Sequence, residues 1–90
     1  MTPVYQEKAE TLKALAHPVR LCIVRNLLDK RCNVGHMQEC LGLPQSTVSQ
    51  HLGILRARGI IRAEKVGQET YYRVVNEDAK NVVLKLIPRL

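Results

Sequence analysis

A chain of 90 residues with a formal net charge of +6 is long enough for one small domain, residues 1–90, and leaves no room for a second core. Its 46% hydrophobic content is almost entirely aliphatic, and the basic balance favours a polyanion as macromolecular partner. An odd number of cysteines, three, is more typical of a protein from a reducing compartment than of a disulfide-bonded secreted domain. The sequence shows no apolar core of a signal peptide and no apolar run long enough to span a bilayer. We therefore expect a cytoplasmic protein with no membrane partner.

Helical periodicity predicts two helices in the first third of the chain. The first covers residues 5–16, and the second runs from Pro18 to about residue 28, because proline is tolerated in the first turn of a helix but not inside one. The apolar residues at helical spacing are Ala9, Leu12 and Ala16 on the first helix, and Val19, Ile23 and Leu27 on the second.

A polar connection, residues 29–32, then leads to a pair of helices separated by a very short turn. Asn33 is a good N-cap for the first of them, and Gly42 ends it. Pro44 opens the next helix and Gly59 stops it. The inward residues of the shorter helix are Val34, Met37 and Leu41. Two short helices joined by a tight turn with glycine match the helix-turn-helix pattern.

The helix after Pro44 has two different faces. Its core-facing stripe consists of Val48, Leu52 and Leu55. Its outer face is polar and almost uncharged near the helix start, and comprises Gln45, Ser46, Ser49, Gln50, Gly53 and Arg56. Glutamine and serine both donate and accept hydrogen bonds, as contact with base edges in a major groove requires, whereas a merely solvated face usually carries Lys and Glu. An ordinary surface helix is the alternative for this stretch taken alone.

After Gly59 the hydrophobic period changes. Residues 60–66 and 70–75 are rich in β-branched residues and tyrosine, and residues 67–69 between them predict a hairpin turn. A hairpin directly after a helix-turn-helix is called a wing. Asn76 then caps a last helix, whose apolar surface is too wide for so small a domain to cover, and we expect a dimer contact there. The residues of that surface are Ala79, Val82, Val83, Leu84, Leu86, Ile87 and Leu90.

With four helices, a hairpin and a final helix, the chain is expected to be mainly α with a small β-hairpin, and it resembles the ArsR/SmtB family of bacterial winged helix-turn-helix repressors. The segments that carry the likeness are residues 12–21 (LKALAHPVRL), 43–52 (LPQSTVSQHL), 55–61 (LRARGII) and 71–73 (YYR). The resemblance implies a homodimer held by its first and last helices. Such a dimer grips a near-palindromic site on double-stranded DNA and is released by a ligand or a chemical signal.

The polar face and the resemblance together predict the contact residues. Those expected at DNA are Gln45, Ser46, Thr47, Ser49, Gln50 and Arg56 on the helix, and Arg62, Lys65 and Gln68 on the hairpin. Those expected at the dimer contact are Tyr5, Leu12, Val83, Leu86, Ile87 and Leu90. His51 matches a position that relatives more often turn inward, so we interpret it as packed or capping.

Two departures from the family pattern bear on DNA affinity. Gly53 stands where many relatives carry Lys, which removes a phosphate contact or lets the helix approach DNA more closely. The wing tip, residues 67–69, is also less basic than in most relatives. Both departures favour modest affinity, or a site recognised more by shape.

The ligand sets of metal-sensing and redox-sensing relatives are missing, so no cofactor is expected. Asn33 and Gly35 stand where some relatives carry two cysteines, and the last helix has neither histidine nor cysteine. A weaker candidate for a soft metal is Cys32, His36 and Cys40, spaced at i, i+4 and i+8, although Asn33 as the cap would leave Cys32 outside the helix.

The cysteines have two interpretations. In one they are functionally silent, with Cys22 buried, Cys40 half-buried and Cys32 exposed. In the other they respond to a signal, with Cys32 the most accessible and its thiolate favoured by the nearby helix start.

The leading hypothesis is a sequence-specific DNA-binding repressor. A winged-helix module that binds protein is an alternative, and it would need an apolar or acidic patch on the helix after Pro44. A thiol- or soft-metal-responsive repressor that uses Cys32, His36 and Cys40 is another. An enzyme is not expected, because the sequence lacks a phosphate-binding loop, a metal triad and a paired nucleophile and base.

Overall fold

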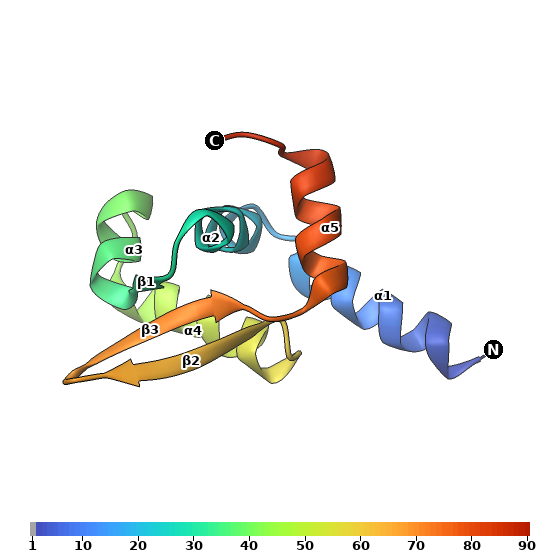
Figure 1. Ribbon diagram of the computed structural model, residues 1–90, viewed down its shortest axis with the longest axis horizontal. Coiled ribbons are helices and arrows are strands. Elements are labelled where there is room, and N and C mark those ends of the chain that lie inside the picture. The colour runs from blue at the N-terminus through green and yellow to red at the C-terminus, as the bar shows by residue number, and fades with distance from the viewer. Residues whose placement is uncertain (1) are drawn as a thin grey trace.

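The computed structural model describes residues 2–90 and has the winged helix-turn-helix order expected from the sequence (Figure 1). The helices are α1 (Pro3–Leu15), α2 (Pro18–Asp29), α3 (Val34–Leu41), α4 (Gln45–Ala57) and α5 (Glu77–Leu86). The strands are β1 (Cys32–Asn33), β2 (Ile61–Val66) and β3 (Glu69–Val74). Across residues 2–90 every helix is too short or too polar to cross a membrane.

The helix ends follow from the residues that stand at them. Asn33 and Asn76 cap α3 and α5 as predicted, since their Oδ1 atoms accept hydrogen bonds from the backbone N–H of the third residue beyond, at 2.8 and 2.9 Å. His17 caps α2 through Nδ1, with Pro18 next to it in the first turn. Gly42 ends α3 with φ of 67°, a left-handed conformation in which a β-carbon is strained.

The connection between α2 and α3 differs from the sequence expectation, because it contains a short strand rather than only polar loop. Cys32 and Asn33 pair antiparallel with Tyr72 and Tyr71, which gives a three-stranded sheet in the order β1-β3-β2. Two residues are too few to produce a periodic signal in the sequence. The pairing ties the start of α3 to the wing.

The core lies where α2, α4 and α5 meet the base of the hairpin. Val48, Leu52 and Leu55 are buried as the α4 periodicity predicts, and the inward residues of α2 join them. On α1 the residues in the core are Ala14 and Leu15, whereas Leu12, which is predicted at the dimer contact, is 53% exposed in the protomer. Only the last turn of α1 meets the core, because the rest of the helix projects away from the body (Figure 1).

The structure of α5 shows that one residue predicted at the dimer contact, Val83, was predicted wrongly. Val83 is fully enclosed in the core of its own protomer, as is Ala79, so Val83 is unavailable to a partner chain. Leu86 and Leu90 are 67% and 71% exposed, and Leu90 lies in the tail beyond the helix.

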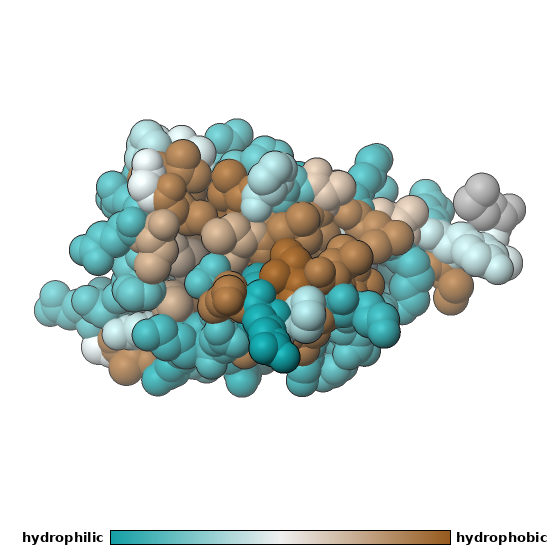
Figure 2. Space-filling view, turned by 90° about the horizontal axis from the view of Figure 1, so that it is seen from above, coloured by the Kyte–Doolittle hydropathy of each residue, from teal (hydrophilic) through white to brown (hydrophobic). Residues whose placement is uncertain are grey.

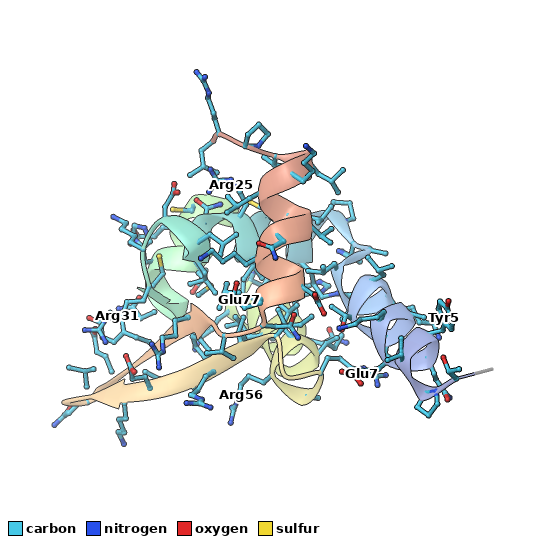
Figure 3. All side chains as sticks on the ribbon, turned by 45° about the vertical axis from the view of Figure 1, so that its right-hand side comes forward. Tyr5, Glu7, Arg25, Arg31, Arg56 and Glu77 are labelled. Carbon is cyan, nitrogen blue, oxygen red and sulfur yellow. The ribbon has the colours of Figure 1, made fainter. Side chains whose placement is uncertain are left out.

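Arg25 holds that C-terminal tail against α2 (Figure 3). Its Nε donates to the carbonyl of Ile87 at 2.6 Å, and its two terminal nitrogens reach the carbonyl of Pro88 at 3.1 Å and the carboxylate of Asp29 at 2.9 Å. The residue is 5% exposed, and these three acceptors satisfy its buried guanidinium.

Candidate nucleic-acid interface

Helix α4 presents a polar face to solvent. The predicted residues Gln45, Ser46, Ser49, Gln50, Gly53 and Arg56 are all exposed, and Thr47 is half-buried. The buried stripe on the opposite side fixes the rotation of the helix, so these side chains project together. Arg56 extends from α4 on the side of the molecule away from the C-terminal tail (Figure 3).

The hairpin beside α4 is tighter than predicted. Val66 pairs directly with Glu69, so the turn contains only Gly67 and Gln68, and Gly67 adopts φ of 64°. The pleat places Arg62 and Lys65 on opposite faces of the hairpin. These two predicted phosphate contacts therefore project in different directions.

Glu69 is a strand residue whose carboxylate is engaged within the protein. Its Oε2 accepts from Asn33 Nδ2 and from the Tyr71 hydroxyl, both at 2.9 Å. The hydrogen bond to Glu69 raises the pKa of Tyr71. Asn33 thus caps α3 with one side-chain atom and anchors the wing with the other, and the acidic group is drawn away from the wing tip.

The basic side chains divide into paired and unpaired groups. Among residues 2–90 the cations of the ion pairs are Lys8, Arg25, Arg31, Arg58 and Arg73. Arg56, Arg62 and Lys65 are exposed and absent from these pairs, so their charges are available to a phosphate backbone.

His51 lies on the inner side of α4, where it packs against α2. Its ring centroid is 4.5 Å from that of His17, and Arg20 approaches its Nδ1 at 3.2 Å. Burial lowers the pKa of His51, and the neighbouring His17 and Arg20 lower it further. This geometry agrees with the interpretation of His51 as a packed residue.

Acidification is therefore expected to destabilise the wild-type protein more than its His51→Gln variant. The unfolded chain binds the His51 proton near pH ~6.5, whereas the folded protein resists it to lower pH. This contribution to stability is complete above the unfolded pKa and is lost as the pH falls through the folded pKa. Urea unfolding at about pH 7.5 and about pH 5.5 measures the difference, with the exposed His36→Gln as control. An equal loss in the wild type and His51→Gln would contradict the assignment.

Gly53 is not required by packing within the protomer. Apart from its chain neighbours and the backbone of its own helix, a β-carbon at this position would meet no atom within 4 Å, and the residue is exposed. Gly53→Ala is expected to raise the free energy of unfolding by about 0.5–1 kcal/mol, because glycine costs about that much inside a helix. Urea unfolding tests this, and a destabilised alanine variant would contradict it. A simultaneous loss of DNA affinity would indicate close approach of α4 to the groove.

The three cysteines are free but their exposure was predicted wrongly. Cys32 is 6% exposed because its strand pairs with β3, whereas Cys40 is exposed and Cys22 half-buried. Burial raises the pKa of Cys32, so the expected activation of its thiolate is also wrong. Cys32 lies outside α3, and within the described part of the chain no group of three or more His, Cys, Asp or Glu could hold a metal ion.

The arrangement defines a class of protein, the winged helix-turn-helix proteins. Comparison with known sequences agrees, since residues 15–64 match a family described as a helix-turn-helix domain. The "HTH-type transcriptional repressor SmtB" of Mycobacterium tuberculosis is 40% identical over 78 residues, which are 87% of this chain and 58% of that protein. The chain therefore spans less than two thirds of that relative.

This chain matches a larger share of two further relatives. The "Transcriptional repressor PagR" of Bacillus anthracis is 40% identical over 92% of this chain and 84% of that protein. Its crystal structure superposes with a TM-score of 0.86 at 38% identity, over 93% of this chain and 97% of that one. The homodimeric winged helix-turn-helix DNA-binding domain Mb0332 of Mycobacterium bovis, described as a possible ArsR-family transcriptional regulator, superposes with a TM-score of 0.83 at 28% identity. The superposition covers 92% of this chain and 77% of that domain.

The chain belongs to the ArsR/SmtB family of helix-turn-helix transcriptional regulators.

Proposed function

We propose that this protein is a sequence-specific transcriptional repressor that binds a near-palindromic site on double-stranded DNA as a homodimer. The observation that carries the proposal is the outer face of α4, where Gln45, Ser49 and Gln50 project together from a helix anchored by a buried stripe. Gln45, Ser46, Thr47, Ser49 and Gln50 serve as base-edge contacts. Arg56, Arg62, Lys65 and Gln68 contact the backbone.

The apolar surface of α1 and α5 supports dimerisation. Seen from the C-terminal end of α5, apolar side chains gather across the middle of the molecule (Figure 2). Leu12 and Val82 line a shallow groove between α1 and α5, and Leu86 lines a second one beside it. We assign Tyr5, Leu12, Leu86, Ile87 and Leu90 to the contact between protomers. The homodimeric state of the Mb0332 domain supports a homodimer here.

The polar character of α4 favours DNA over a protein partner. A protein-binding winged helix would present an apolar or acidic patch there, whereas the exposed residues are glutamine, serine and glycine, with Arg56 at the end. SmtB and PagR are both named as transcriptional repressors, which supports repression over activation. It also supports a regulatory function over an enzymatic one.

The cytoplasm is the proposed location, since bacterial DNA lies there and free thiols persist in a reducing compartment.

Selection of binding sites from random duplexes tests the proposal. The expected product is a near-palindromic site that binds two chains, with affinity that falls steeply as salt rises. Fluorescence anisotropy gives the affinity for the selected and for scrambled duplexes. Equal affinity for both would show that the chain does not discriminate sequence, and would overturn the proposal.

A further inference from the structure

A cavity of about 90 Å³ lies between α2, α3 and the C-terminal tail. All three cysteines of the chain line it, although they come from three different elements. The apolar part of the wall is formed by Ile23, Met37, Leu41 and Leu90. None of the three thiols around this apolar cavity belongs to the proposed DNA-binding surface.

The three thiols differ in their surroundings. Cys40 is exposed, and its Sγ lies 3.6 Å from Nε2 of His36, one helical turn earlier in α3. Cys32 is buried and its thiol points to the carbonyl of Lys30. Cys22 is half-buried. Of the three, Cys40 combines access from solvent with an imidazole that can accept its proton.

We propose that Cys40 is a modification site for small apolar electrophiles that carry an electron-poor carbon–carbon double bond. A thiol and a base within hydrogen-bond reach form the arrangement that activates cysteine as a nucleophile. The adjoining cavity holds the carbon skeleton of the reagent. A metal ion fits less well, because residues 2–90 offer no cluster of three suitable ligands.

The size of the cavity limits the reagent. An apolar cavity of about 150 Å³ accommodates the six carbon atoms of benzene, so a cavity of about 90 Å³ suits roughly four non-hydrogen atoms in addition to the carbon that bonds to Cys40 at the surface. A short enone such as methyl vinyl ketone has this size. Its apolar end can lie against Met37 and Leu41 while its double bond meets Cys40 near the surface.

The reaction balances without an oxidant. His36 takes the proton of the Cys40 thiol, and the thiolate sulfur bonds to the β-carbon of the enone. The π electrons move to the α-carbon, which then recovers the proton from the His36 imidazolium. The product is a thioether, formed by addition of S–H across the double bond.

The cavity lies between the C-terminal tail, which is near the proposed dimer contact, and α3, which packs against the proposed DNA-binding helix. The effect described next rests on the proposed function. Leu90 closes the cavity from the tail that Arg25 holds, and α3 on its other side packs against α4. A filled cavity displaces α3 or the tail, and with it the α4 face or the dimer contact. Modification of Cys40 therefore weakens DNA binding.

Mass spectrometry tests the modification without DNA. The folded wild-type protein is treated with methyl vinyl ketone, and the adducts are mapped and timed. Cys40 is expected to react at least about tenfold faster than Cys22 and Cys32, and His36→Gln is expected to remove most of that advantage. The exposed neighbour Glu39→Gln is the matched control and should keep it. Equal rates at the three cysteines, or an unchanged rate in His36→Gln, would overturn the proposal.

Anisotropy on a selected duplex tests the consequence. Treated wild type is expected to lose at least about tenfold in affinity, a coupling of the usual size, while treated Cys40→Ser keeps its affinity. Full affinity of the fully modified wild type would overturn the regulatory role and leave the modification site standing. Failure of the untreated protein to prefer any duplex would instead contradict the proposed function.

Discussion

Replacing Leu86 with glutamate is expected to convert the protein into folded monomers. Leu86 is 67% exposed in the protomer and borders the apolar groove on α5, so a charge there leaves the fold intact but is costly once a second chain covers it. One monomer holds only one half-site, and affinity for the palindromic duplex should fall by about 100-fold or more. Sedimentation velocity, circular dichroism and anisotropy measure the three effects.

Lys80→Glu is the matched control for this experiment. Lys80 is exposed on the same helix but does not line the apolar grooves, so its variant should remain a dimer. A folded, stable dimer of the Leu86→Glu protein would place the interface elsewhere.

Gln45→Ala and Gln50→Ala are expected to reduce discrimination between the selected site and random DNA. A bidentate contact to a base edge contributes about 1–3 kcal/mol of discrimination, or roughly 5- to 150-fold in affinity ratio. Both side chains are exposed, so the free energy of unfolding should change little. Anisotropy on matched and scrambled duplexes gives the ratio.

Arg56→Ala and Lys65→Ala are expected to change overall affinity for DNA and not the preference for the selected site. They should weaken binding to every sequence alike, and each should lower the slope of log affinity against log salt by about 0.9. Retention of full site preference in both glutamine variants would show that α4 does not lie in the groove as proposed.

The sequence predicts the element order well because local signals set most helix ends. Asn33 and Asn76 cap their helices, Pro18 opens α2, and Gly42 closes α3 in a left-handed conformation. The polar face of α4 was also predictable, because its buried stripe repeats at helical spacing and fixes which residues point outward.

Features that depend on distant contacts were not predictable. The burial of Cys32 arises from pairing with Tyr72, 40 positions along the chain, and two paired residues leave no periodic pattern. The enclosure of Val83 within its own protomer depends on how α5 packs against α2. The engagement of Glu69 by Asn33 likewise requires β1, which brings α3 against the wing.

Methylation protection on a selected duplex tests the central claim, that two α4 helices enter the major groove, most directly. Dimethyl sulfate methylates guanine N7, which lies in that groove. The account predicts protection in two successive major grooves on one face of the duplex, with centres about 10 base pairs apart. Full methylation of major-groove guanines in a duplex saturated with protein would contradict it.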